Sequence, residues 1–108
     1  MGRIPKRLFG PAQLTNAAAT KYTVPANRRA ILRHIRISNP SGNAVNLTLS
    51  IGADTAATRI FDAFPIGANS EKDHFCYHVL EATEIIQAFG STTLVLVLVI
   101  NGDEVVLS

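Results

Sequence analysis

Residues 92–100 read TTLVLVLVI, and this stretch decides the fold that the sequence predicts. The apolar run at 94–100 has seven residues, far fewer than the roughly 20 that a membrane-spanning helix needs. Leucine alternates with β-branched valine, which suits a pleated strand better than a helix. Turn residues bound the run at 90–91 and 101–102. We therefore predict a strand buried on both faces. One face would pack on an opposing sheet, and the other needs a second cover from this chain or a neighbouring subunit.

The composition predicts one globular domain with a single core. Of 108 residues, 47% are hydrophobic and only 17% are charged. The one cysteine excludes an internal disulfide. The basic start MGRIPKRLFGP lacks the apolar segment of a secretory signal. We expect a soluble protein with no membrane partner.

Charge is unevenly distributed along the chain although the net charge is only +2. The first third carries eight cations and no acid: Arg3, Lys6, Arg7, Lys21, Arg28, Arg29, Arg33 and Arg36. All the acids follow, starting at Asp54. This asymmetry is typical of a nucleic-acid patch or of charge complementarity within a molecule or with a neighbour. Because the total is near neutral, we favour complementarity.

Further short strands are expected on both sides of residues 92–100. The clearest covers 45–51, where Val45, Leu47, Leu49 and Ile51 alternate with polar residues, as on a strand with one solvated face. A short edge strand and a loop are expected at 13–19, and other strands at 20–24, 30–38, 59–64, 72–80, 84–89 and 105–107. The last would pair back through a hairpin at Asn101-Gly102.

The strand at 30–38 changes parity part of the way along. Ala30 and Leu32 fall on one face and Ile35 and Ile37 on the other. Either both faces are covered at its start, or a bulge near Arg33 and His34 resets the register. About eight strands at a spacing of about ten residues, with no helical period, predict an all-β fold: a single-domain, jelly-roll-like β-sandwich over residues 13–108.

Residues 1–12 are expected to form an extended basic N-terminal arm outside the sandwich. Pro5, Gly10 and Pro11 disfavour a place inside a sheet. The arm would reach onto a neighbouring protein, with cations that set orientation and apolar anchors. The expected interface residues are Arg3, Ile4, Lys6, Arg7, Leu8 and Phe9. The alternative is a disordered tail.

The segment His74-Phe75-Cys76-Tyr77-His78 is the one cluster of metal-ligating residue types. On a strand the two histidines and the cysteine share one face, but His74 and His78 would stand about 13 Å apart, too far to bind one ion. We therefore expect no metal and no cofactor. Phe75, Tyr77 and Val79 are expected to fill the core, and His74, Cys76 and His78 to face solvent or a neighbouring subunit.

No catalytic arrangement is evident in the sequence. The glycines at 42, 52, 67 and 90 are isolated turn residues rather than a phosphate-binding loop, and no oxyanion turn accompanies Cys76. The arginines at 28, 29, 33 and 36 lack the interleaved aromatics of a single-strand binding surface. We expect a protein that is not an enzyme and does not bind nucleic acid.

The segment KYTVPANRRAILRHIRISNPSGNAVNLTLSIGAD, residues 21–54, resembles a pattern found in small structural proteins of tailed bacteriophages. In that pattern Y-T-V-P precedes a hydrophobic strand, an N-x-S-G turn, an alternating strand and a glycine. The matching residues are Tyr22, Thr23, Val24, Pro25, Ala30, Ile31, Asn39, Ser41, Gly42, Leu47, Leu49, Ile51 and Gly52. LEATEIIQAFG at 80–90 continues the resemblance more loosely. The segment 27–29, Asn-Arg-Arg, departs from it, because a Gly-Lys turn is more usual there.

The resemblance implies a non-enzymatic virion protein, assembled in the host cytoplasm. The expected role is a capsid decoration (cementing) protein that self-associates, with a trimer as the expected stoichiometry, and binds the major capsid protein or other virion proteins. A tail, collar or baseplate protein is the first alternative. A carbohydrate- or receptor-binding β-sandwich is the second, and the absence of tryptophan and the scarcity of tyrosine count against it.

Overall fold

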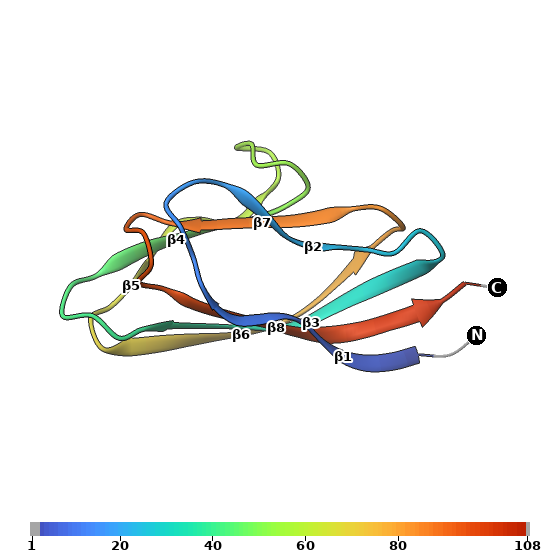
Figure 1. The fold of residues 1–108 in the computed structure, drawn as a ribbon, viewed down its shortest axis with the longest axis horizontal. Coiled ribbons are helices and arrows are strands. Elements are labelled where there is room, and N and C mark those ends of the chain that lie inside the picture. The colour runs from blue at the N-terminus through green and yellow to red at the C-terminus, as the bar shows by residue number, and fades with distance from the viewer. Residues whose placement is uncertain (1–2, 108) are drawn as a thin grey trace.

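The computed structural model describes residues 3–107, which form eight strands in two four-stranded antiparallel sheets. The strands are β1 (Arg3–Gln13), β2 (Ala19–Thr23), β3 (Arg28–Asn39), β4 (Val45–Ile51), β5 (Arg59–Ile66), β6 (Ser70–Leu80), β7 (Ile85–Gly90) and β8 (Val97–Val106). One sheet has the order β1-β8-β3-β6 and the other β2-β7-β4-β5. Figure 1 shows the two sheets as stacked layers, with both ends of the chain at one end of the sandwich.

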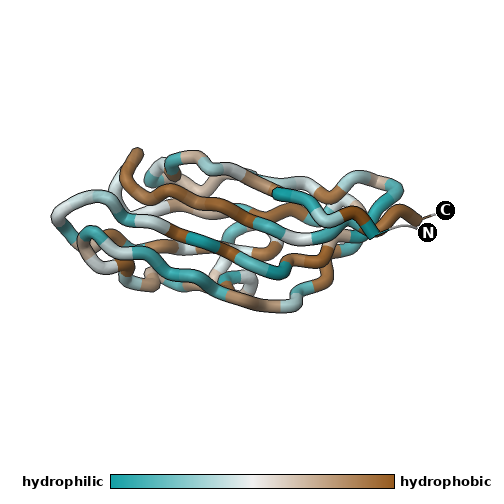
Figure 2. Tube along the Cα trace, turned by 90° about the horizontal axis from the view of Figure 1, so that it is seen from below, coloured by the Kyte–Doolittle hydropathy of each residue, from teal (hydrophilic) through white to brown (hydrophobic). Residues whose placement is uncertain are grey.

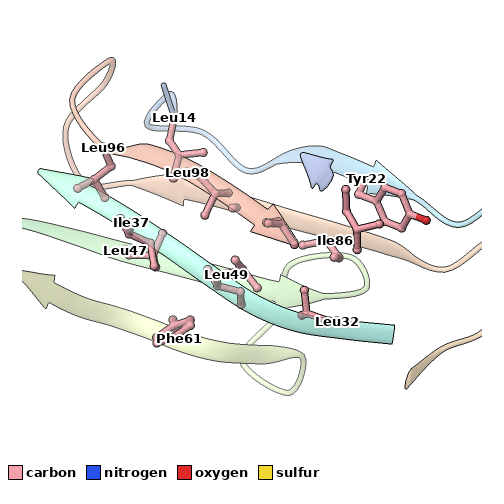
Figure 3. Close-up of a cluster of buried hydrophobic side chains, with 14 of the residues drawn as sticks. Leu14, Tyr22, Leu32, Ile37, Leu47, Leu49, Phe61, Ile86, Leu96 and Leu98 are labelled. Carbon is pink, nitrogen blue, oxygen red and sulfur yellow. The ribbon is translucent and has the colours of Figure 1, made fainter. Parts of the chain in front are cut away.

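The strand order is that of a jelly roll. Strands pair as β1 with β8, β2 with β7, β3 with β6 and β4 with β5, as in one long hairpin rolled up on itself. The predicted all-β, jelly-roll-like sandwich is therefore confirmed. The core lies between the layers, and its side chains alternate along the strands with outward ones. Figure 3 shows this cluster, in which Leu32, Ile37, Leu47, Leu49, Leu96 and Leu98 are completely buried.

The change of parity in β3 is a bulge, one of the two predicted alternatives. The register of β3 shifts between Leu32 and His34 in its pairing with both neighbours. Arg33 and His34 therefore both lie outward, while Leu32 and Ile35 both reach the core. The bulge keeps the two apolar halves of the strand on the same face.

The apolar run at 94–100 and the following residues differ from the prediction. Leu94 is exposed and has a φ of 56°, so it belongs to the turn before β8. β8 continues through Asn101-Gly102 without a hairpin and includes residues 105–106 of the strand predicted at 105–107. Glycine is needed at position 102 because of close packing and not because of a turn: a Cβ there would lie 2.2 Å from the Ile31 carbonyl oxygen. Val97 and Val99 are half-buried, so β8 is fully covered on one face only.

Two other predicted features are wrong in detail. In place of the short edge strand and loop expected at 13–19, a loop over 14–18 joins β1, which ends at Gln13, to β2, which begins at Ala19. The polar face of β4 is not solvated throughout, because Thr48 and Ser50 are both buried. The Ser50 hydroxyl donates to Asp54 at 2.6 Å, and the Thr48 hydroxyl accepts from the Ala63 amide at 3.1 Å. Figure 1 shows the loop that carries Asp54 folded over the layer containing β4.

The expected basic arm is not confirmed. Its residues 1–2 lie outside the described residues, and the rest is β1, an edge strand paired with β8 from Arg3 to Gln13. Pro5 and Pro11 are tolerated in β1 because one side of an edge strand makes no backbone hydrogen bonds to a neighbouring strand, and because the register of β1 shifts around Phe9. Gly10 is required, because a Cβ would lie 2.1 Å from the Leu98 carbonyl oxygen.

Candidate functional surfaces on strand β6

Strand β6 has the opposite orientation to the one that the sequence predicted. Phe75, Tyr77 and Val79 point outward and are 77%, 61% and 47% exposed. His74, Cys76 and His78 are half-buried and point toward the opposite sheet. Both sets alternate with the period of a strand, so the pattern alone could not identify the inner face. We placed the aromatics inside because large apolar residues are usually buried, and β6 is an exception.

The outward residues of β6 and β3 form a surface of aromatic rings and cations, which we call the β6 outer face (Arg33, His34, Phe75, Tyr77, Val79). The His34 ring stacks on Phe75 with centroids 4.6 Å apart. The Arg33 guanidinium lies 5.4 Å from the centroid of the Tyr77 ring. The bulge in β3 makes this possible by turning two consecutive residues outward.

Acids neutralise most of the cations beside this face. Arg33 Nε donates to Asp103 at 2.6 Å, and Arg36 pairs with both Glu71 and Asp73 at 2.9 Å. His34 lies 2.9 Å from Asp73, and hydrogen bonds from His34 and then Arg36 hold the pKa of Asp73 below its ordinary value. The predicted charge complementarity is therefore present within one molecule. A neutralised face of this kind does not favour nucleic acid, which binds unpaired cations.

The inward residues form a second cluster, the β6 inner cluster (His74, Cys76, His78). Their ligand atoms all lie within 4.8 Å of one another. The expectation that they stand too far apart to share an ion is therefore wrong. β6 holds one residue more than β3 here, since His74 lies opposite Ile35 and His78 opposite Leu32. The four residue steps from His74 to His78 therefore span the length of three steps, about 10 Å along the strand instead of about 13 Å. The imidazole side chains reach toward each other across that distance.

The surroundings of the inner cluster are apolar on the core side. The His74 ring meets the edge of Phe61, with centroids 5.0 Å apart, and Cys76 Sγ lies 3.5 Å from the Leu32 carbonyl oxygen. Burial, then the nearby charges of His78 and Lys72, lowers the pKa of His74. Burial also raises the pKa of the Cys76 thiol.

The residues predicted for the arm are brought together only in part. Leu8 joins the core and Phe9 packs against it, while Arg3, Ile4 and Arg7 are exposed along β1. Lys6 reaches Glu104 on β8 at 3.3 Å.

Sequence reasoning missed the group around Glu104, which is completely buried and also accepts hydrogen bonds from the Tyr22 hydroxyl and from Arg28. The available signal was Asp103-Glu104, two adjacent acids that only Asn101-Gly102 separates from the apolar run at 94–100.

The described residues offer little that resembles an enclosed active site. A surface hollow of about 300 Å³ is lined by the residues around the β3–β4 and β5–β6 turns, with Glu71 as its one titratable group. Residues 3–107 contain no helix that is long and apolar enough to cross a membrane.

Comparison with known proteins gives a likeness of fold. No family model and no curated protein matches the chain. A solved structure described as "Bacillus endospore appendages form a novel family of disulfide-linked pili" superposes with a TM-score of 0.57 at 10% sequence identity. The likeness covers 98% of this chain and 89% of that one. At that identity the chain is similar to the pilus subunit in its sandwich fold alone.

Proposed function

We propose that this protein is a non-enzymatic structural subunit that assembles with copies of itself through the β6 outer face. The observation that carries the proposal is the ladder of Phe75, Tyr77 and Val79, exposed on an edge strand whose inner face already contributes to a complete core. The sandwich buries its core without these side chains. Large exposed apolar side chains gathered on one strand mark an interaction site.

The composition of the β6 outer face fits a protein partner. Phenylalanine, tyrosine and arginine are enriched at the centres of protein interfaces, and lysine and acids are depleted there. Arg33 and His34 are already held against the rings, so little side-chain entropy remains to be lost on binding. The free edge of β6 carries Glu71, Lys72 and Asp73, charges of the kind that protect an edge from strand pairing. The face rather than the edge is therefore the contact.

The contact must extend beyond β6, because a stable interface covers about 800 Å² on each partner. The neighbouring strands supply more apolar surface, including the half-buried outward residues Val97 and Val99 of β8. Figure 2, which views the molecule from the side of this sheet, shows the apolar part of β8 as a brown tract that gives way to teal toward the chain end. This face is where we place the second cover that the sequence demanded for the apolar strand, at Val97 and Val99.

The virion is the proposed location, on the strength of the resemblance at residues 21–54. Jelly rolls build viral capsids as well as lectins, so the fold is compatible with that role without deciding it. Capsid decoration is the first expectation and a tail, collar or baseplate position the alternative. The pilus subunit with a similar sandwich is another example of this architecture used as a building block.

The test is the oligomeric state of the double variant Phe75→Ser/Tyr77→Ser. We expect the wild type to sediment as a closed homo-oligomer, a trimer by expectation, and the variant as a monomer with an unchanged thermal transition. Leu94→Ser is the matched control, since Leu94 is 58% exposed in a turn before β8 and its loss should not change the mass. A wild-type protein that stays monomeric at high concentration contradicts the proposal. Immunolabelling of purified phage particles then tests the location.

Carbohydrate binding is the second candidate, favoured by the exposed rings of Phe75 and Tyr77, because sugar faces stack on aromatic side chains. The absence of tryptophan and the scarcity of tyrosine count against this candidate. Glycan binding that is lost in the double variant, with no change in mass, would favour this candidate.

A further inference from the structure

The β6 inner cluster has the dimensions of a metal site. In tetrahedral zinc sites nitrogen ligands lie about 2.0–2.1 Å and sulfur about 2.3 Å from the ion, which places the ligand atoms about 3.3–3.6 Å from one another. The three atoms of His74, Cys76 and His78 lie within 4.8 Å of one another, so some point lies no more than about 2.8 Å from each. Small rotations about the side-chain bonds close the remaining distance, about 0.5 Å for the sulfur and about 0.7–0.8 Å for the nitrogens.

The donor set selects the kind of ion. Two imidazoles and a thiolate are borderline-soft ligands, which suit zinc and its neighbours and not magnesium or calcium. The three protein ligands leave a fourth position for water, because the cluster is half-buried and open to solvent. Phe61 backs His74 on the core side and fixes the orientation of its ring.

We propose that His74, Cys76 and His78 bind one zinc ion, with water as the fourth ligand, and that the ion fixes the bulged segment of β6. This inference does not depend on the proposed assembly, because the ion lies on the inner face of β6 and the assembly uses the outer face. Both sets of residues alternate along one strand, so each can be removed without touching the other.

The test uses the full-length protein, stripped of metal with a chelator under reducing conditions. Cobalt(II) is the first probe, since it substitutes for zinc and reports a thiolate ligand by a charge-transfer band and tetrahedral coordination by intense visible bands. We expect both signals to saturate at one cobalt per chain and to disappear on addition of one zinc. Zinc should also slow the reaction of Cys76 with a thiol reagent, and the chelator should restore it.

The chain supplies its own matched controls. Cys76→Ser should abolish the charge-transfer band. His74→Ala and His78→Ala should each weaken zinc binding at least about tenfold, since the loss of even an outer-shell partner costs metal sites 10–100-fold. His34→Ala removes the remaining histidine, which faces outward, and should leave binding unchanged. Phe75→Ser should also bind zinc as the wild type does.

Two results would overturn the inference. One is a metal-free protein that gives no charge-transfer band with cobalt and no saturable heat with zinc. The other is zinc binding that survives Cys76→Ser and His74→Ala alike, which would place the ion elsewhere. The thermal transition of each variant without metal shows whether it is folded, and a zinc-dependent rise in Tm seen in the wild type but not in His78→Ala is a second measurement of the same site.

Discussion

At the scale of single residues, the least expected group is the carboxylate of Glu104, which belongs to a residue with 0% exposure. It accepts hydrogen bonds from the hydroxyl of Tyr22, from Arg28 at 2.6 Å and from Lys6 at 3.3 Å, and so connects β8 to β2, β3 and β1. Burial alone would raise its pKa, but these hydrogen bonds outweigh burial and lower the pKa below the ordinary 4.5. The same burial, together with the bond to Glu104, raises the pKa of Tyr22.

Glu104→Gln should lower the free energy of unfolding at pH 7 by about 2–3 kcal/mol, because the buried Tyr22 hydroxyl and the partly exposed cations Arg28 and Lys6 would then face a neutral amide. The folded-state pKa of Glu104 lies below the unfolded value. Its charge therefore stabilises the fold above pH 4.5, and this contribution is lost as the pH falls through the folded-state pKa. Urea unfolding from pH 7 down to pH 3 should show the gap between wild type and variant narrowing below pH 4.5. Glu81→Gln, in an exposed pair with Arg29, is the control and should change little. A gap that stays constant with pH would contradict the assignment.

Thr83 is strained in the turn between β6 and β7. Its φ is 68°, in the left-handed region that β-branched residues rarely adopt, and its side chain is exposed. Thr83→Asn should raise the free energy of unfolding by about 0.5–1 kcal/mol, because asparagine tolerates this conformation. Thr92→Asn, at an exposed threonine outside the left-handed region, should have no such effect. Thermal unfolding of the two variants compares them directly, and equal changes would remove strain as the explanation.

At the scale of the strand, β8 shows where packing overrides turn chemistry. Asn101-Gly102 is a strong hairpin signal, yet the chain runs straight through it because Gly102 lies against the backbone of β3. Gly102→Ala should lower the free energy of unfolding by at least about 2 kcal/mol, since its methyl group would overlap the Ile31 carbonyl. Gly42→Ala, with nothing within 4 Å of the added methyl, is the control. Urea unfolding at neutral pH measures the stability of both variants. A Gly102→Ala protein as stable as the wild type would show that the backbone of β3 shifts to accommodate the methyl group at little cost.

The same scale explains what the sequence could predict. Turn residues and period-2 alternation predict most strands. The parity change at Leu32 and Ile35 predicts either a bulge in β3 or a start covered on both faces, and the register of the strand pairs shows the bulge. Alternation does not show which face of a strand is buried, and the prediction that Phe75, Tyr77 and Val79 of β6 fill the core is wrong. The convergence of His74 and His78 could not be predicted either, because it depends on an extra residue in β6 relative to its partner, and pairing register is a property of two strands. Glu104 was missed because its partners lie on three other strands.

At the scale of the whole molecule, the jelly roll makes both ends of the chain part of one sheet. β8 lies second in its sheet only because β1 covers its outer edge, with Leu8 reaching into the core and Lys6 reaching Glu104. Among the described residues β1 is therefore a structural strand rather than an arm. The basic residues that remain exposed on it, Arg3 and Arg7, are available to a neighbour without leaving the sheet.

Deletion of residues 2–9 should consequently destabilise the fold. The truncation removes most of the pairing between β1 and β8, exposes the edge of a long apolar strand and takes away one cation bonded to a buried carboxylate. We expect a fall in Tm of at least about 10 °C, given that each kcal/mol shifts a domain of this size by about 4–8 °C, and a tendency to aggregate. Arg3→Ala/Arg7→Ala, which removes the exposed charges but keeps the strand, should leave Tm within about 2 °C of the wild type. If the truncated protein has the same Tm as the wild type, residues 2–9 do not stabilise the fold, and the arm that the sequence predicted is the better description. Calorimetry of the wild type, the truncated protein and the double variant measures the three Tm values.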